Sequence, residues 1–243
     1  MISLLRKELI SFFGNLLGYI TIIVFVTLIS LFMWVFPGDF NVLDAGYANI
    51  DTLFMIAPWV FMFLIPAITM RLFADEKKAG TIELLLTKPL SDLQIIMAKY
   101  FAGFILVLFA LMPTLTYYIS VFLLGNPIGN IDSGGAWGSY LGLLFLASGF
   151  LAIGVFSSSL TDNSIVAFII GVFICFFFYV GFESISSFEW FGALDYIILN
   201  IGINEHYTSM SRGVIDTRDV IYFLSLTSFF IVLTLTKLES RKW

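Results

Sequence analysis

Long unbroken apolar runs dominate the pattern of hydrophobic and polar positions along this chain. A helix needs about 20 mostly apolar residues to cross the roughly 30 Å hydrocarbon core of a bilayer. Six runs are long enough: residues 16–36, 53–73, 99–124, 138–160, 164–182 and 220–236. None has a lysine or arginine near its centre, where such a charge costs about 2.5–3.5 kcal/mol on insertion scales. The pattern therefore predicts an all-α integral membrane protein with six transmembrane helices.

The composition agrees with this pattern. Hydrophobic residues make up 60% of the 243 positions and charged residues only 12%, a balance that soluble globular domains do not have. Arg6 and Lys7 precede the first run as they would in a signal peptide, but the run is too long for one and no A-x-A-like cleavage site follows it. The single cysteine, Cys175, lies inside the fifth run, so neither a disulfide framework nor a thiolate metal site is expected.

The basic residues fall mainly on one side of the predicted membrane. Arg212 and Arg218 lie on the opposite side, whose first two loops contain aspartates but no lysine or arginine. The other ten are Arg6, Lys7, Arg71, Lys77, Lys78, Lys88, Lys99, Lys237, Arg241 and Lys242. Because lysine and arginine concentrate in cytoplasmic loops, both termini are predicted to be cytoplasmic.

Several kinds of chemistry are missing from the sequence. All ionisable residues map to run ends or loops, whereas ion-coupled carriers place such groups inside the bilayer. A phosphate-binding loop needs a Gly-Lys pair, and the chain has none. We therefore expect no enzyme activity and no cofactor in this chain, so that any ATP and Mg²⁺ would be bound by a partner subunit. The net charge of −5 gives no sign of a nucleic-acid partner.

One loop between the second and third runs, ADEKKAGTIELLLTKPLSD, concentrates charge. Gly80 permits a sharp turn, Thr81 can cap a helix, and TIELLLTK gives about two helical turns before Pro89 ends them. Ser91 and Gln94 have capping-box spacing and start the next helix. A short helix is therefore predicted at the membrane surface. It either lies among the lipid headgroups or presents a surface to a soluble partner.

The N-terminal segment predicts a second element on the same side. Apolar and polar positions alternate there with helical spacing. The apolar face holds Ile2, Leu5, Leu9, Phe12 and Phe13, and the polar face holds Ser3, Lys7 and Ser11. Such a helix lies in the membrane interface and contacts lipids. The residues assigned to this interfacial helix are Leu5, Arg6, Lys7 and Leu9.

The stretch EKKAGTIELLLTKP, from Glu76 to Pro89, resembles the signature loop of the type-2 ABC exporter permeases. The six-run layout extends this resemblance over residues 1–243, as a single permease domain. The resemblance implies that the N-terminal interfacial helix and this loop, as a coupling helix, dock onto a separate ABC ATPase subunit. The implied contact residues are Glu76, Gly80, Thr81, Ile82, Glu83, Leu84, Leu85 and Pro89.

Longer stretches are similar to one branch of that family, the permease subunit of the bacterial gliding-motility ABC complex (GldF type). They are NLLGYITIIVF, APWVFMFLIPAITMRLFADE and SRGVIDTRDVIYF. Lys88 departs from the wider family, in which many members have a small polar residue. The similarity implies an inner-membrane subunit that works with a GldA-type ATPase. Its partner in the membrane would be either a GldG-type second permease or a second copy of this chain, as a homodimer. A membrane anchor that assembles a surface or secretion apparatus without moving a substrate stays open as the alternative.

The long loop after the fifth run contains the remaining polar groups. Residues 190–203 are apolar but too short to span a membrane, so short outer helices are expected, as in the resembled family. We interpret His206 as part of a structural network rather than as a catalytic base, since the chain has no G-x-S-x-G nucleophile motif. A hydrolase that uses His206 is the weaker alternative. The predicted network contains His206, Arg212, Asp216, Arg218 and Asp219.

Two further features concern packing. Pro113 in the third run predicts a kink, with Thr114 and Thr116 placed to hydrogen-bond the freed carbonyls. Small residues four apart in the fourth run allow helices to approach closely, within one bundle or between subunits. The pairs are Gly138 with Gly142, Ser148 with Ala152, and Gly154 with Ser158.

Overall fold

The computed structural model of the protein describes residues 1–86, 90–188, 192 and 195–240. Every regular element in these residues is a helix, which confirms the predicted all-α fold. The π-helical elements are η1 and η3, and η2 is a 3-10 turn. In chain order the elements are α1 (Ile2–Gly14), α2 (Leu16–Ser30), η1 (Leu31–Val35), α3 (Val42–Ala45), α4 (Asp51–Thr69), α5 (Arg71–Lys78), α6 (Thr81–Leu86), α7 (Asp92–Leu111), η2 (Met112–Thr114), α8 (Leu115–Leu124), α9 (Ser133–Leu160), α10 (Ser164–Phe176), η3 (Phe177–Gly181), α11 (Phe182–Ser186), α12 (Asp195–Ile201), α13 (Ile203–Met210) and α14 (Thr217–Glu239).

Six helical segments among the described residues are long and apolar enough to cross a membrane. Each overlaps one of the predicted runs, so the prediction of six spans is confirmed. The second and third segments are longer than predicted because polar turns of α5 and α7 extend the apolar helices. The segments are Gly18–Val35, Asp51–Lys78, Asp92–Leu124, Ser133–Leu160, Ser164–Ser186 and Thr217–Glu239.

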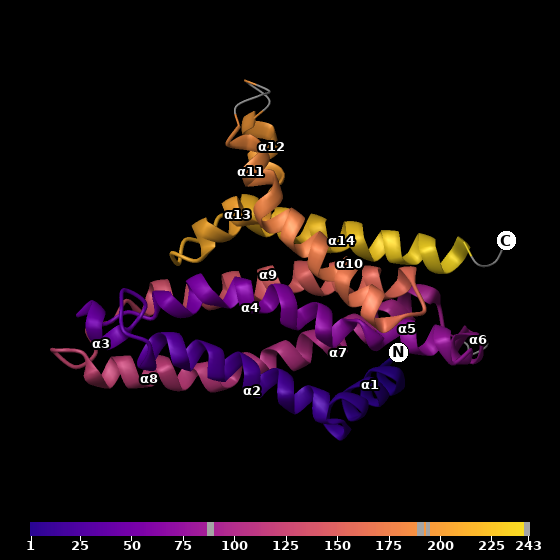
Figure 1. The fold of residues 1–243 in the computed structure, drawn as a ribbon, viewed down its shortest axis with the longest axis horizontal. Coiled ribbons are helices and arrows are strands. Elements are labelled where there is room, and N and C mark those ends of the chain that lie inside the picture. The colour runs from indigo at the N-terminus through magenta and orange to yellow at the C-terminus, as the bar shows by residue number, and fades with distance from the viewer. Residues whose placement is uncertain (87–89, 189–191, 193–194, 241–243) are drawn as a thin grey trace.

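The spans run side by side along the long axis of the molecule (Figure 1). α9 and α4 lie in the middle, with α2, α7 and α8 on one side and α10 and α14 on the other. Burial follows this order: 72% of the apolar window of the α9 span is buried, but only 28% of the α2 span and 22% of the α10 span. The outermost spans therefore leave most of their apolar surface uncovered by the rest of the chain.

The third span is interrupted at Pro113, where α7 gives way to the 3-10 turn η2. The hydroxyl of Thr114 donates to the carbonyl of Leu111 (2.6 Å), and that of Thr116 donates to the carbonyl of Pro113 (2.7 Å). Carbonyl groups in a membrane must find a partner inside the protein. The helix thus changes to a 3-10 turn at the predicted position, and the two threonines hydrogen-bond carbonyls of this segment.

The glycines of α9 allow other helices to approach it closely. A Cβ added to Gly142 would come within 2.7 Å of the Met210 Cβ on α13, and one added to Gly138 within 2.5 Å of the Gly213 carbonyl oxygen. Gly154 lies against Thr69 of α4. At these positions the small-residue pattern reflects packing within one bundle.

The segment between the fifth and sixth spans leaves the bundle and returns to it. α10 continues through η3 into α11, and α11 and α12 extend sideways from the bundle (Figure 1). α13 then packs back onto α9. The short helices expected in this region are therefore present. Four positions of the predicted apolar stretch, 190, 191, 193 and 194, lie outside the described residues.

α1 packs against α7 and α2, with a buried face that coincides only in part with the predicted apolar face. Its buried residues are Leu4, Glu8 and Phe12, whereas Ile2, expected on the apolar face, is 79% exposed. The sequence analysis gave no position to Glu8, which an ion pair described below buries. Partly buried beside this stripe are Leu5, Leu9 and Phe13.

Replacing Gly142 with leucine is expected to force α13 away from α9, since even the first added carbon overlaps Met210. Overpacking of this kind costs about 1–3 kcal/mol, so the variant should unfold at a lower temperature. Thermal unfolding in detergent can be followed with a thiol-reactive dye on Cys175, the only cysteine in the sequence, which is fully buried. Gly14→Ala, where an added Cβ meets no atom within 4 Å, is the control. Equal unfolding temperatures for Gly142→Leu and the wild type would contradict the described packing.

Candidate functional site

The loop between the second and third spans consists of two short helices and a tight turn. α5 ends at Lys78, Gly80 has a left-handed backbone with φ +67°, and α6 begins at Thr81. A Cβ added to Gly80 would meet no atom within 4 Å, so the positive φ, and not lack of space, requires glycine. The structure thus has a turn at Gly80 followed by a short helix, as the sequence predicts.

Thr81 contacts the end of α5, and α6 has one buried and one exposed side. The Thr81 hydroxyl donates to the carbonyl of Glu76 (3.3 Å), one of the last carbonyls of α5, which have no partner within their own helix. On α6, Ile82 is 6% exposed and thus buried, while Thr81 and Glu83 are exposed. α6 therefore presents Thr81 and Glu83 to the surroundings of the protein.

The other predicted contact residues are placed differently. Leu84 and Leu85 belong to α6, but their side chains lie outside the described part of the chain, as does all of Pro89. Glu76 lies on α5, and its side chain points into the protein with 15% of its surface exposed. There it meets two lysines.

A buried lysine joins three helices beside this loop. The side chain of Lys99 on α7 is 1% exposed, and its ammonium lies 3.0 Å from Glu8 Oε1 and 2.9 Å from Glu76 Oε2. The same ammonium donates to the carbonyl of Leu72 (2.6 Å) and lies 5.1 Å from the ring centroid of Phe73. Because Glu8 belongs to α1 and the other partners to α5, Lys99 connects α1, α5 and α7.

Lys7 adds a second cation from the surface of α1. Its ammonium lies 2.9 Å from Glu76 Oε1 and 3.2 Å from Glu8 Oε1. Partial burial disfavours the charged form of Lys7, but hydrogen bonds and charges from Glu76 and Glu8 together outweigh burial and raise the pKa of Lys7. The neighbouring Arg6 is exposed. Two lysines thus balance two glutamates, and we refer to Lys7, Glu8, Glu76 and Lys99 as the Lys99 cluster.

The sequence analysis missed this cluster because it counted Lys99 as one of many basic residues on the predicted cytoplasmic side. The informative signal was Glu8, which stands between Leu4 and Phe12 at helical spacing on the face that is buried. A carboxylate on such a face needs a cation from another helix. The sequence alone did not show which lysine provides it.

The start of α5 is attached to α9 by one serine. Ser158 of α9 donates to the carbonyl of Met70 (2.9 Å) and accepts from the amides of Phe73 (3.0 Å) and Ala74 (3.2 Å). The first amides of a helix have no partner inside it, so this hydroxyl allows α5 to begin next to the end of α4. The sequence analysis treated Ser158 only as a small packing residue, because bonding to a distant helix has no local sequence signature.

Two further contacts attach the rest of α5. The hydroxyl of Ser164, at the start of α10, donates to Asp75 (2.7 Å), and Lys77 donates to the carbonyl of Ser159. α5 is therefore bonded to α1, α7, α9 and α10, and only two residues separate it from α6. α6 thus directly follows a helix that is bonded to four others.

At the opposite end of the bundle, His206 of α13 joins the short helix α12 to the first turn of α14. Its Nδ1 lies 2.7 Å from Asp219 Oδ1 on α14, and its Nε2 lies 2.9 Å from the carbonyl oxygen of Asn200 on α12. The imidazole stacks on Tyr222 with 3.9 Å between ring centroids. Since both ring nitrogens have partners, this geometry favours the structural role of His206 over that of a catalytic base.

The remaining members of the predicted outer network lie apart from His206. Asp216 caps α14 by accepting from the amide of Arg218 (2.9 Å), and this backbone hydrogen bond lowers the pKa of the exposed Asp216. Arg212 lines a polar cavity at this end of the bundle. The structure thus brings together His206 and Asp219, and separately Asp216 and the backbone of Arg218.

The fold and these contacts define a class of protein: a polytopic helical membrane protein with a short helix, α6, at one end of the bundle beside a buried charge cluster. Among the described residues, no group of three or more His, Cys, Asp or Glu side chains could hold a metal ion.

Residues 39–237 match the ABC-2 family transporter proteins, and because the match covers most of the chain, the protein belongs to this family. Its members are the membrane permease components of ABC transporters, which work with a separate ABC ATPase. No individually curated protein matches the chain.

Replacing Lys99 with methionine is expected to destabilise the protein strongly. The change leaves the carboxylates of Glu8 and Glu76 without their buried cation, and breaking a buried ion pair in this way costs about 3–5 kcal/mol. Lys7→Met removes a lysine of the same cluster whose side chain is 59% exposed, and exposed pairs contribute no more than about 1 kcal/mol. Thermal unfolding of both variants in detergent is the measurement. A Lys7→Met variant that loses as much stability as Lys99→Met would show that the burial of Lys99 is not what matters.

Proposed function

We propose that this chain is the permease subunit on which an ABC ATPase docks at α6, and that it passes the ATP-driven movement of the ATPase to the membrane spans. The observation that carries this proposal is the attachment of α5. The Lys99 cluster and Ser158 hold it to α1, α7 and α9, while α6 begins after two intervening residues and presents Thr81 and Glu83 outward. An ATPase pair that closes on ATP would push on α6 and would move α5 with it.

The distribution of basic residues supports a cytoplasmic position for α6. α1 and the last turn of α14 lie at the same end of the bundle as α6 (Figure 1). Lysine and arginine are enriched on the cytoplasmic side of membrane proteins, where an ATPase would find its nucleotide. In this orientation α11, α12 and α13 lie toward the outer surface. The described basic residues of the α6 end are Arg6, Lys7, Arg71, Lys77, Lys78, Lys99 and Lys237.

The gliding-motility complex of the bacterial inner membrane is the specific setting that we propose. Its support is the similarity of NLLGYITIIVF, APWVFMFLIPAITMRLFADE and SRGVIDTRDVIYF to the GldF-type permease. In that setting the partners are a GldA-type ATPase and a GldG-type second permease, with a homodimer as the other arrangement. The exposed apolar faces of the α2 and α10 spans leave room for either partner.

A non-transporting membrane anchor is the second candidate function. The observation that favours it is the dense apolar packing in the middle of α9, where Leu143, Leu146 and Phe150 are 0% exposed. This packing fills the centre of a single subunit, so a transported substrate would have to use a surface shared with a partner subunit. An anchor has no such requirement.

Reversing the exposed charge of α6 in Glu83→Arg is expected to abolish recovery of the ATPase when tagged protein is purified from its native membrane. Proline fixes φ near −65°, so Gly80→Pro should disrupt the turn before α6 and remove stimulation of the ATPase. The measurements are co-purification followed by mass spectrometry, and an ATPase assay. Both variants must insert into the membrane as the wild type does. The control is Glu239→Arg, which reverses an exposed charge in the last turn of α14, at the same end of the bundle as α6. This variant should still recover the ATPase. Normal ATPase recovery and stimulation in both α6 variants would count heavily against the proposal.

A partner ATPase that binds but cannot hydrolyse ATP separates the two candidate functions. A transporter should still assemble with this partner, as judged by co-purification, but cells should lose the motility or surface function. An anchor needs only assembly, so function should persist. Persistence of function with hydrolysis blocked would reject transport in favour of the anchor.

A further inference from the structure

The imidazole of His206 lies between two hydrogen-bond acceptors from different helices. Its Nδ1 is 2.7 Å from Asp219 Oδ1 on α14, and its Nε2 is 2.9 Å from the carbonyl oxygen of Asn200 on α12. A neutral imidazole has one N–H to donate, whereas an imidazolium has two. With a single N–H, a nitrogen lone pair would face an oxygen lone pair across one of these contacts. Both contacts are therefore hydrogen bonds only if an extra proton is present.

Acid strength and burial favour the ring as the place of the extra proton. Carboxylic acids lose their proton much more readily than imidazolium ions do. His206 is 6% exposed and Asp219 is 5% exposed, and a buried carboxylate needs a close cation or hydrogen-bond donors. In the described part of the chain, His206 provides the one ion pair of Asp219. The geometry thus favours an imidazolium paired with a carboxylate.

The end of α12 adds a second negative partner for the ring. His206 bonds the carbonyl of Asn200, and the hydroxyl of Tyr222 on α14 donates to the carbonyl of Ile201 (2.6 Å). These carbonyls belong to the last two residues of α12, where they have no partner inside the helix and carry the negative end of its dipole. A phenol is uncharged below about pH 10, so the Tyr222 bond does not depend on pH near neutrality. The cationic ring therefore connects α12 to α13 and α14.

The other charged residues of the surrounding elements are exposed, bonded elsewhere or distant along their helix. α9 and η3 also pack against α13, and neither contains a charged residue. Glu205 on α13 and Arg218 on α14 are exposed. Glu183 of α11 accepts from a side-chain amide of α13 (2.7 Å), and the one charged residue of α12, Asp195, stands at its opposite end. The proton on the ring is thus controlled mainly by Asp219 and by the end of α12.

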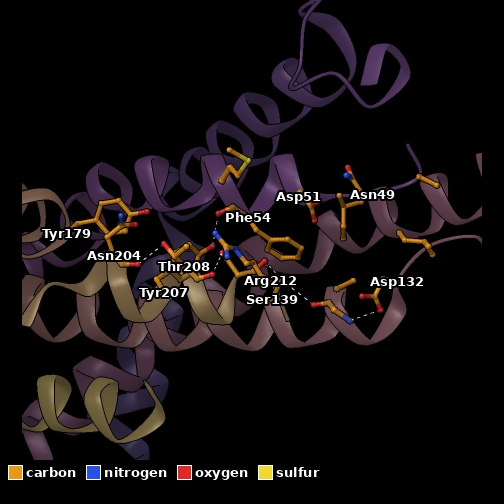
Figure 2. A pocket seen from close by; sticks show the side chains of 17 residues that line it. Asn49, Asp51, Phe54, Asp132, Ser139, Tyr179, Asn204, Tyr207, Thr208 and Arg212 are labelled. Atoms are coloured by element: carbon orange, nitrogen blue, oxygen red, sulfur yellow. Dashed lines mark hydrogen bonds between the residues drawn. The ribbon is translucent and has the colours of Figure 1, made fainter. Parts of the chain in front are cut away.

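α13 is held to the bundle by hydrogen bonds that do not involve His206. The Tyr207 hydroxyl donates to the carbonyl of Phe54 on α4 (2.7 Å), and Ser139 of α9 donates to the carbonyl of Ser211 (2.8 Å). Figure 2 shows Tyr207 and Ser139 in the wall of the polar cavity, which has a volume of about 610 Å³ and which His206 does not line. The cavity also receives side chains from distant segments, namely Asp51, Asp132 and Arg212. A change at His206 therefore leaves α13 attached.

We propose that His206 is a pH-sensitive clasp: as an imidazolium it holds the end of α12 against α13 and α14, and loss of one ring proton loosens α12. A free histidine is mostly neutral above about pH 6.5. The proton held in the folded clasp therefore stabilises this contact at neutral pH, and the stabilisation falls as the pH rises. α12 is the element that responds, because it packs mainly against α11 and α13 and extends with α11 sideways from the bundle (Figure 1). In the orientation proposed above, the clasp lies toward the outer surface and responds to the outer pH.

Asp219→Asn separates the charge of the ring from its hydrogen bonds. The introduced side-chain amide can donate to Nδ1, so a neutral ring with its proton on Nε2 still bonds the carbonyl of Asn200. This variant should hold α12 equally well at neutral and alkaline pH. The matched control is Glu205→Gln, which removes an exposed carboxylate next to His206 that forms no ion pair with the ring. This control should behave as the wild type does.

His206 is the only histidine in the sequence, so nitrogen NMR of histidine-labelled protein in detergent, purified with a histidine-free tag, reports this ring alone. In the wild type and in Glu205→Gln, both ring nitrogens should carry a proton at pH 7.5, where an exposed histidine is about nine-tenths neutral. One of these protons should be lost by pH 9.5. In Asp219→Asn the ring should be neutral at both pH values. Thermal unfolding verifies that each variant is folded.

Hydrogen exchange followed by mass spectrometry tests whether the proton holds α12. After correction for the intrinsic base-catalysed rate, the amides of α12 in the wild type should exchange at least about tenfold faster at pH 9.5 than at pH 7.5. In Asp219→Asn the corrected rates should be equal. The proposal is overturned if the wild-type ring is neutral at pH 7.5, if it keeps both protons at pH 9.5, or if exchange of α12 does not follow the loss of the proton. None of these outcomes bears on ATPase docking, because every measurement uses the purified chain alone.

Discussion

The ammonium of Lys99 is removed from water and surrounded by oxygens from two other helices, and the structure of the α6 end depends on this contact. Burying an ion costs several kcal/mol unless close partners compensate for the lost hydration. Glu8, Glu76 and the Leu72 carbonyl provide them at 3.0, 2.9 and 2.6 Å. α1 and α5 therefore cannot leave α7 without exposing an uncompensated charge to apolar surroundings. This explains why an acidic residue, Glu8, lies on the buried face of α1.

Interrupted helices place a second constraint on the bundle, because a membrane offers no water to unpaired backbone groups. Both interruptions in the second and third spans are satisfied by hydroxyl side chains. Ser158 bonds the backbone of α5 where it follows α4, and Thr114 and Thr116 bond the carbonyls around Pro113.

The sequence predicted the parts of the structure that local rules control. Span number and span position follow from apolar length, and the capping box of Ser91 and Gln94 is present as predicted. The Lys99 cluster could not be predicted, since residues 8, 76 and 99 meet only through the packing of three helices. The same holds for the cavity, where Asp51, Asp132 and Arg212 come from distant segments. Charge bias gave no sign that Lys99 is buried, because a lysine at a span end is ordinarily solvated.

α9 connects these two regions directly. Its first turns contribute Asp132 and Ser139 to the cavity, and Ser158 near its other end bonds the start of α5. A helix of 28 residues is about 42 Å long, and the glycines along it hold α13 at one end and α4 at the other. Ser158 and the cavity residues of α9 thus belong to one continuous helix, so the start of α5 and one wall of the cavity are positioned by the packing of the same element.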